Sequence, residues 1–438
     1  MKNACLVMLS ALTVALGVSA CTAASSSEPT SSSTTQSVIT SAATLPEFAL
    51  NAPDKPVNAG VHSAGTTYLS SLRDFSKKML RKVDTEEENF VFSPLSVATC
   101  FSMAYEGAKG DTKAELAAML GYEEEDYDPH ADIQNMHQRT SVKQHLNNGQ
   151  DIYLDVSESY FVDSNYSKHI RKEYLDTLER YYYAEAYHAD LGSDASHELL
   201  AEWINGKTFD FFHLEKDNFK DFEGVLWLVN ALYLKSYWAI SSHAIDHPFT
   251  SSDGVTSTVP GIRLADDYLF AWSSDEYDVA GIPLSGGVTL RVMQEKQSSE
   301  LDPIDVLLDP DAYLGEQRGY EFRCEMPKWS TRSTLDPLSM FESEIPHAIN
   351  PAISDFSGMS DFTDVEPLYL SNSIHQAGID VNELGIEGAA YTVIAISGAS
   401  AISTEPEKMT IKLDHPFHYA VVTSEGYPLF LGKINHLA

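Results

Sequence analysis

Apolar and polar positions alternate with two different periods along this chain, which predicts a mixture of helices and strands. Apolar side chains have helical spacing from Val97 to Leu120 and from Lys168 to Ala184. Strand-like apolar runs cover Leu226 to Leu234, Val288 to Val292 and Phe417 to Leu431. From about residue 61 onwards no internal repeat and no linker rich in Gly, Ser or Pro divides the chain. One large α+β domain is therefore expected.

The segment from Glu383 to Thr404 has an unusual composition. After Glu387 it carries seventeen consecutive residues with neither charge nor proline. An exposed segment of this kind tends to pair with other sheet edges, and soluble proteins normally prevent this with charge, proline or a bulge. A central strand is one interpretation. The length of the run and the glycines Gly385, Gly388 and Gly398 favour a mobile loop.

The flanks of this segment resemble those of the serpin family. The hinge before the reactive-centre loop of serpins reads Glu-x-Gly-x-Glu-x-Ala-Ala, and here it is Glu383, Leu384, Gly385, Ile386, Glu387, Gly388, Ala389 and Ala390. Further matches are LDHPF at Leu413 to Phe417, the Ser-Pro-x-Ser signature within Asn89 to Leu120, and NALYLKSYW at residues 230–238. The resemblance runs from about residue 61 to the C-terminal residue.

This resemblance implies a fold and a function. The fold would be the serpin fold: a central mixed β-sheet, additional sheets, about eight to nine helices and an exposed reactive-centre loop. The function would be that of a suicide substrate for serine proteases, or less commonly cysteine proteases. The nucleophile of the target attacks a carbonyl of the loop to form an acyl-enzyme. The cut hinge then enters the central sheet as a new strand and traps the target.

Two other functions are open at this stage. One is a non-inhibitory surface binding protein on the same fold. The other, more remote, is a hydrolase, but the sequence contains no G-x-S-x-G, C-x-x-C or H-E-x-x-H motif and no phosphate-binding glycine loop. The chain is thus expected to be a protease inhibitor and not an enzyme, with no catalytic residues, cofactor or metal of its own.

The hinge sequence is compatible with insertion into a sheet, where side chains alternate between the two faces. One face would carry Ile386, Gly388, Ala390, Thr392 and Ile394, all of which suit a hydrophobic layer. The other would carry Glu387, Ala389, Tyr391, Val393 and Ala395, with its charge and its tyrosine in solvent. Three positions depart from the family: Ile386 replaces Thr or Ser, Gly388 replaces alanine, and Tyr391 replaces a smaller residue. None of them puts a proline or a charge on the inward face.

Two ways of counting place the cleaved bond differently. Counting forward from Glu383 by the spacing usual in the family gives Ala399-Ser400, whereas counting back from Pro416-Phe417 gives a position near Glu405. The hinge-side length sets how far the protease is carried, so the forward count is preferred. Ala399 would suit an elastase-like pocket. Cleavage after Ala401 or Ile402 is an alternative, and cleavage after Glu405 would imply an acidic-specific target.

Other residues match the parts of a serpin that control sheet opening. Ser93, Ser96, Asn230 and His375 match the shutter, a polar network under the central sheet. Trp238 matches the breach, where the loop first enters. These residues would be structural controls and not reagents, because buried polar clusters of this kind are normally hydrogen-bonded.

The N-terminal residues predict export. Lys2 and an apolar run from Ala4 to Val18 have the pattern of a leader peptide, and the run is shorter than a membrane-spanning helix. Residues 18–21 (VSAC) resemble a bacterial lipobox, which would make Cys21 a lipidated N-terminus. We therefore expect a leader at residues 1–20, a Ser/Thr-rich disordered tether at 21–60 and the serpin domain at 61–438. An exported protein is expected, either a cell-surface lipoprotein or extracellular.

Charge and cysteine content limit the partners. The formal net charge of −35 argues against nucleic acid and anionic glycans. The membrane would be contacted only through the lipid on Cys21, and a monomer that meets a target protease is expected. Beyond Cys5 and Cys21 only Cys100 and Cys324 remain. These are too few for a disulfide framework, and two free thiols are favoured over one bridge.

Overall fold

The computed structural model describes residues 6–13, 66–84, 88–122, 127–146, 149–222, 224–361, 367–386 and 407–437. Within these ranges the helices are α1 (Thr66–Val83), α2 (Pro94–Gly107), α3 (Gly110–Leu120), α4 (His130–Arg139), α5 (Lys172–Tyr182), α6 (Asp194–Lys207), α7 (Pro303–Leu308), α8 (Pro310–Leu314), α9 (Pro337–Phe341) and α10 (Pro346–Ile349), with 3-10 turns η1 (Ser167–His169) and η2 (Lys216–Phe219).

The strands are β1 (Leu6–Thr13), β2 (Phe90–Phe92), β3 (Val142–His145), β4 (Asp151–Asp163), β5 (Glu185–Ala189), β6 (Leu226–Tyr237), β7 (Ser241–Thr250), β8 (Thr256–Ser273), β9 (Tyr277–Leu284), β10 (Val288–Glu295), β11 (Arg318–Pro327), β12 (Trp329–Leu335), β13 (Leu370–Asn382), β14 (Gly385–Ile386), β15 (Glu407–Lys412), β16 (Phe417–Thr423) and β17 (Pro428–Ile434). The α+β prediction is confirmed.

Three details differ from the predicted elements. The described residues contain ten α-helices where eight to nine were expected, because α8, α9 and α10 are single short turns of four or five residues. The predicted helix from Val97 to Leu120 is two helices, since Ala108 is extended and ends α2. The predicted strand from Phe417 to Leu431 is a hairpin, which turns at Gly426 with a positive φ of 93°.

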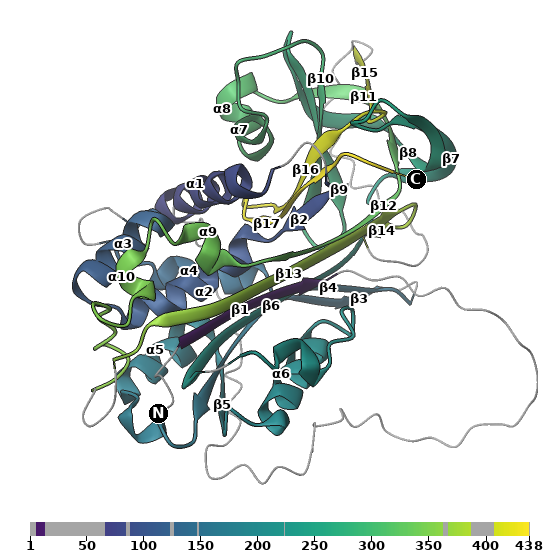
Figure 1. Ribbon diagram of the computed structural model, residues 1–438. Helices are drawn as coiled ribbons and strands as arrows, with labels where there is room; N and C mark the ends of the chain where they lie inside the picture. The colour runs from purple at the N-terminus through teal and green to yellow at the C-terminus, as the bar shows by residue number, and fades with distance from the viewer. Residues whose placement is uncertain are drawn as a thin grey trace, which may run out of the picture.

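The strands form two sheets. In the central sheet the order is β13-β14-β6-β4-β3, with β1 also between β13 and β6, β12 beside β13 and β5 beside β4. The second sheet has the order β15-β11-β8-β9-β10-β16-β17-β2, with β7 beside β8. Figure 1 shows the long strands β13 and β6 crossing the molecule, with α2 on one side of them and α6 on the other.

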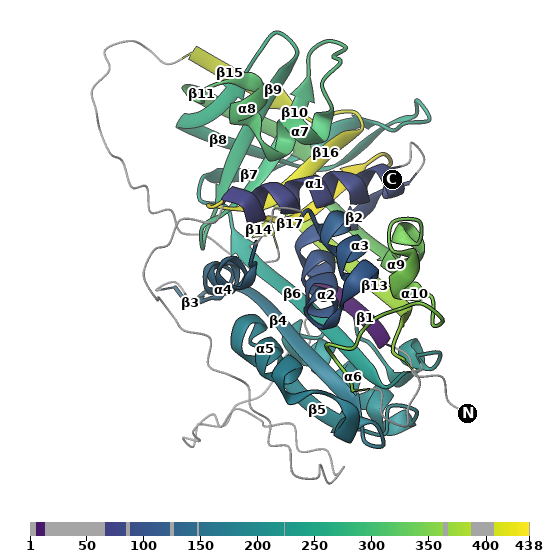
Figure 2. The ribbon, with the colours of Figure 1, turned by 90° about the vertical axis from the view of Figure 1, so that its left-hand side faces the viewer.

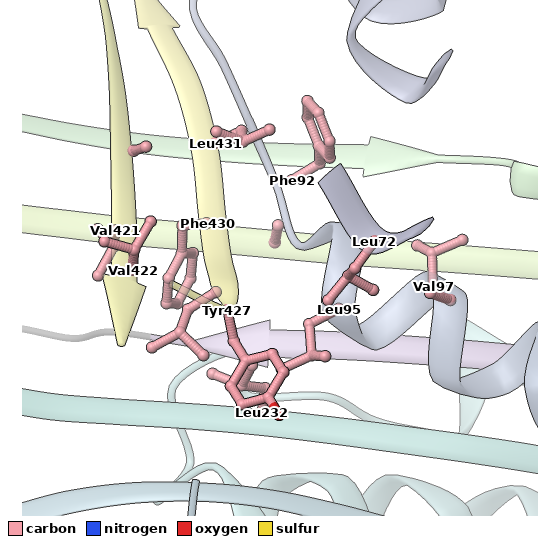
Figure 3. Close-up of a cluster of buried hydrophobic side chains, with 14 of the residues drawn as sticks. Leu72, Phe92, Leu95, Val97, Leu232, Val421, Val422, Tyr427, Phe430 and Leu431 are labelled. Carbon is pink, nitrogen blue, oxygen red and sulfur yellow. The ribbon is translucent and has the colours of Figure 1, made fainter. Parts of the chain in front are cut away.

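Both faces of the central sheet are covered. β6 is buried along nearly its whole length, which is why its sequence is an almost continuous apolar run. The inner face packs on α2, whose N-terminus is capped by Ser93 and begins with Pro94. Figure 3 shows this core, where Leu95 and Val97 of α2 meet side chains from both sheets. A smaller cluster joins the outer face of β6 to α6.

The strand β1 comes from the N-terminal apolar run and lies inside the central sheet (Figure 1). It is parallel to both neighbours, β13 and β6. A chain exported and processed after residue 20 would lack β1. This structure is that of the unprocessed chain, and removal of a leader stays a prediction. Cys21 and the tether at 21–60 lie outside the described residues. Among the described residues no helix is long and apolar enough to cross a membrane.

Candidate functional site: the slot between β6 and β13

The hinge predicted from the sequence enters the central sheet between β6 and β13. After β13 the chain reverses at Glu383 and Leu384, and β14 runs back antiparallel to both neighbours. Ile386 is fully buried there. Gly385 has no room for a side chain, because a Cβ would lie 2.2 Å from the carbonyl oxygen of Ser236. The predicted hinge residues Glu383, Gly385 and Ile386 therefore lie together at the mouth of an opening in the sheet.

Polar contacts hold the reversal at this mouth. The indole nitrogen of Trp238 donates to the carbonyl oxygen of Asn382 at 2.8 Å, and its backbone N–H donates to that of Leu384 at 3.1 Å. The Glu383 carboxylate is 2.5 Å from the ammonium of Lys328. The hydrogen bond to Lys328 lowers the pKa of Glu383 below its ordinary value of 4.5. Trp238 thus lies beside the hinge at this mouth, and its role as the breach stays a prediction.

We call the space between β6 and β13 the slot. It holds β14 at one end and β1 further along, and Figure 2 shows the sheet from a second side. The two strands fit one register. β14 pairs Ile386 with Ser236 and Val381, while β1 pairs Ser10 with Asn230 and His375. The step from the β6 partner to the β13 partner is the same in both cases and holds from Val7 to Ala11, with a register shift between Leu6 and Val7, so the slot accepts a single extra strand in one frame over this stretch.

Three of the four predicted shutter residues form one hydrogen-bonded group. The Ser93 hydroxyl accepts from the backbone N–H of Ser96 at 3.1 Å. The backbone N–H of Ser93 donates to Nε2 of His375 at 3.0 Å. All four predicted residues are fully buried. Asn230 is not part of this group, because the slot and β1 separate it from His375.

Asn230 instead belongs to a second polar group that sequence reasoning missed. Its amide donates to the Glu158 carboxylate at 2.8 Å, and the other Glu158 oxygen is 3.5 Å from Nδ1 of His137 on α4. Both side chains are fully buried. A signal was present in the sequence, since Glu158 occupies an apolar-face position in the alternation of β4. This group ties α4, β4 and β6 together at the edge of the slot.

The remaining predicted site residues lie outside the described residues. These are Glu387, Gly388, Ala389 and Ala390 of the hinge, Ala399, Ser400, Ala401, Ile402 and Glu405 around the cleaved bond, and Cys21. Cys100 and Cys324 are both described and buried, and no disulfide joins them. Burial raises the pKa of the Cys324 thiol, so that side chain stays protonated. In the described part of the chain no cluster of His, Cys, Asp or Glu could hold a metal ion.

Comparison with known proteins agrees with this geometry. The family model described as "Serpin (serine protease inhibitor)" matches residues 70–437. Neuroserpin of Mus musculus is 25% identical over 374 residues, which are 80% of this chain and 86% of that protein. Iripin-8 of Ixodes ricinus is 27% identical over 375 residues, 82% of this chain and 91% of that protein.

Solved structures show the same fold. The native state of Tengpin, described as a thermophilic serpin, has a TM-score of 0.67 at 19% identity and covers 86% of this chain and 96% of its own. Serpin48 of Tenebrio molitor, described as highly specific, has a TM-score of 0.68 at 20% identity and covers 86% of this chain and all of its own. At these identities the likeness supports the architecture and not the target.

Proposed function

The chain belongs to the serpin family of serine protease inhibitors, and from this premise we propose that it is a suicide substrate that traps a serine protease with an elastase-like pocket. The observation that carries the proposal is the slot. It accepts a strand bonded to β6 and β13 at once, and the hinge strand β14 already occupies its mouth. A loop cut beyond the hinge would continue along this path in a form of the chain without β1, which here pairs with Leu226 to Tyr233 of β6.

The register of β14 says where each loop residue would arrive. Each step forward from Ile386 moves one step back along β6 and one step back along β13. Glu387 to Ile396 would then face Lys235 to Leu226. Thr392 would arrive between Asn230 and His375, at the shutter. Insertion would therefore place the polar side chain of Thr392 at the polar level formed by Asn230 and His375.

Side-chain burial has to favour insertion. Backbone hydrogen bonds contribute about 0.5–1.5 kcal/mol per residue, and ordering the backbone costs about 1–2 kcal/mol per residue, so these terms nearly cancel. The inner-face partners on β6 are Leu226, Leu228, Leu232 and Leu234, all fully buried. Ile394 and Ile396 would join them, each gaining about 1.5–3 kcal/mol on full burial. Burial of these side chains on the apolar inner face would therefore make the free energy of loop insertion favourable.

The outer face differs from the sequence-based expectation. We expected Tyr391 to meet solvent there, but its partners would be Ala231 and Gln376, and α6 covers Ala231. Lys235 and Gln376 on this face are half-buried, whereas Ala231 is buried. Tyr391 would therefore be partly covered by α6 and not fully exposed. Insertion at this level requires space between the sheet and α6.

Covalent trapping gives the direct test. The domain from residue 61 onwards is mixed with pancreatic-type elastase and analysed on an SDS gel, with mass spectrometry of the released C-terminal peptide. We expect a band near the summed mass that survives boiling, and a peptide that begins at Ser400. A cut loop without this band, and without gained heat stability, would support the non-inhibitory alternative. Steady release of products from an ester substrate would instead support the hydrolase.

A matched pair of loop variants makes this test specific. Thr392→Arg would put a charge on the inner face of the slot, where it cannot be solvated, so we expect cleavage without trapping. Ser403→Arg adds the same charge beyond the Ala399-Ser400 bond and leaves the inserted part unchanged. Equal trapping by both variants would contradict insertion through the slot.

We extend the proposal to location. Lipidation of Cys21 and a tether of about forty residues would hold the domain on the order of 35 Å from a membrane surface. The test is phase partitioning of the full-length chain in a non-ionic detergent after bacterial expression. Wild type should enter the detergent phase and Cys21→Ser should not. Equal partitioning would rule out the lipid anchor and leave the inhibitor proposal untouched.

A further inference from the structure

The segment between α6 and η2 crosses the slot on the outer face of the sheet. We call residues 208–214 the strap. α6 packs on β6 through Trp203 and Ile204, which touch the cluster containing Val229 and Ala231. The strap continues from the end of α6 and reaches β12 and β13 on the far side. Its two ends therefore contact opposite sides of the opening.

Two phenylalanines two residues apart make these contacts. The ring of Phe209 lies 4.6 Å from that of Tyr233 on β6 and 4.8 Å from that of Tyr153 on β4. The ring of Phe211 lies under the guanidinium of Arg332 on β12, 4.0 Å from ring centre to guanidinium carbon. Tyr233 borders the slot on one side, and Gly378, the register partner of Arg332, borders it on the other.

Arg332 is fixed in place for this contact. Its two terminal nitrogens donate to the two carboxylate oxygens of Asp380, each at 2.9 Å. This planar, bidentate geometry leaves the face of the guanidinium free to stack on an aromatic ring. Gly378 makes the approach possible, because a Cβ there would lie 2.5 Å from Cδ of Arg332 and 2.6 Å from the Phe211 ring. The Arg332 side chain therefore passes over β13 at Gly378 and reaches Phe211 of the strap.

The strap holds an unfavourable backbone shape. Phe209, Asp210 and His213 have positive φ values of 52°, 60° and 49°, a region that non-glycine residues rarely adopt. Asn205 of α6 supports this shape, since its side chain is hydrogen-bonded to both the N–H and the carbonyl of Leu214. A short, stiff segment with anchors on two strands is sensitive to the distance between those strands.

That distance changes by a whole strand when the slot fills. Neighbouring strands lie about 4.8 Å apart, so an inserted strand moves β6 and β13 from about 4.8 Å to roughly twice that separation. The structure has strands in the slot, and the contacts of Phe209 and Phe211 are therefore those of the widened sheet. Closing the slot would bring Tyr233 and Gly378 together and displace one of the two anchors.

We propose that the strap fastens the central sheet in its widened state, with Arg332 as the residue that positions it on the β13 side. This inference rests on the proposed function, because it assumes that the sheet widens when the cut loop inserts. Arg332 is a positioning residue here: it touches neither the loop nor the target. Its loss should weaken the cleaved, loop-inserted protein more than the uncleaved one.

The test compares the melting temperatures of the uncleaved and loop-cleaved domain from residue 61 onwards, which lacks β1 and therefore has no N-terminal strand in the slot before cleavage, in guanidinium-containing buffer. The variant is Arg332→Met with Asp380→Asn, which leaves no unpaired buried carboxylate. The matched control is Arg263→Met with Glu325→Gln, a pair of similar exposure whose Nε to Oε1 distance is 2.9 Å, on β8 and β11 away from the slot. We expect the gain in melting temperature on cleavage to fall by about 2–4 °C in the Arg332 variant and to be unchanged in the control.

Each outcome decides the matter. Phe211→Leu, which keeps an apolar side chain of the strap beside Gly378 but removes the ring stacked on Arg332, should reduce the gain on cleavage in the same direction. Equal losses in the cleaved and uncleaved forms, with a normal wild-type gain, would overturn the role of the strap alone. A wild-type protein that gains no stability on cleavage would overturn the proposed function, and with it the widened state that the strap is meant to fasten.

Discussion

The backbone N–H of Ser93 donates to Nε2 of His375 at 3.0 Å, although 282 positions separate the two residues. Ser93 caps the buried helix α2, and His375 lies on β13 at the edge of the slot. The bond therefore fixes the helix below the sheet to one of the two strands that must separate. Because Nε2 of the imidazole accepts a hydrogen bond from a buried backbone N–H, this nitrogen of His375 carries no proton.

His375→Ala should destabilise the domain and weaken the attachment of β13 to α2. The Ser93 N–H would lose its buried acceptor, which costs about 1–3 kcal/mol. We expect a lower melting temperature and, on warming, polymers or prematurely inserted monomers on size-exclusion chromatography. The control is His415→Ala, which removes an exposed imidazole paired only with Asp414. Unchanged heat stability and a monomeric elution profile for His375→Ala would refute this role.

Gly385→Ala should slow the entry of the hinge. A Cβ would lie 2.2 Å from the Ser236 carbonyl oxygen, and the φ of 151° does not suit an alanine. The destabilisation of β14 should exceed about 1 kcal/mol. On the SDS gel with the target protease, we expect more cleaved inhibitor and less trapped complex. Gly254→Ala is the control, since Gly254 also has positive φ but no neighbouring atom within 4 Å; equal trapping by both variants would argue against the hinge contact.

The sequence predicted those parts of the site that belong to short, recognisable motifs. The described hinge residues lie beside Trp238 at the mouth of the slot, and Ser93, Ser96 and His375 form a separate group further along it; their roles as hinge, breach and shutter stay predictions. The partners of Asn230 were not predicted, because Glu158 and His137 come from elements whose packing on β6 no local pattern specifies. The Arg332 contact with Phe211 was missed for the same reason. Contacts between side chains that are far apart in the sequence depend on how the elements pack, which only the three-dimensional structure shows.

Glu158→Ala should be among the most damaging single changes outside the hydrophobic core. It would leave the Asn230 amide and the His137 imidazole without this carboxylate in a fully buried place, at a cost of about 3–5 kcal/mol. We expect the double variant with His137→Leu to be less unstable than the sum of the single changes, by about 0.5–3 kcal/mol. Urea unfolding of the four proteins in this cycle measures the coupling. Strict additivity would mean that the two side chains act independently.

Glu383 and Lys328 predict a pH dependence at the mouth of the slot. The folded pKa of Glu383 is lowered below 4.5, so its contribution to stability is present above the unfolded pKa and is lost as pH falls through the folded value. The Glu383 side chain is 40% exposed, so the effect should stay below about 1 kcal/mol. Glu383→Gln should destabilise the protein at pH 7, and its difference from wild type should shrink as pH falls through the lowered pKa of Glu383. A difference in stability between the two proteins that does not shrink as pH falls would contradict this account.

The N-terminal segment and the cut loop need the same partners. β1 pairs Leu6 to Thr13 with Leu226 to Tyr233 of β6, and the register of β14 would bring residues 389–396 of the loop to those same positions. Two strands cannot hydrogen-bond to one edge at the same place. A peptide with the sequence of residues 6–13 should therefore bind the domain from residue 61 onwards and exclude the loop.

Added in excess, this peptide should raise the melting temperature of the uncleaved domain, by an amount equivalent to about 2.7 kcal/mol at one hundred times its dissociation constant. It should also turn the inhibitor into a plain substrate, because the protease would still cut the loop but the slot would be filled. The control is a peptide of the same composition in scrambled order. If both peptides leave the melting temperature and the trapped complex unchanged, residues 6–13 do not compete with the loop for the slot. Trapping could then still be tested with the loop variants, since those do not depend on the N-terminal segment.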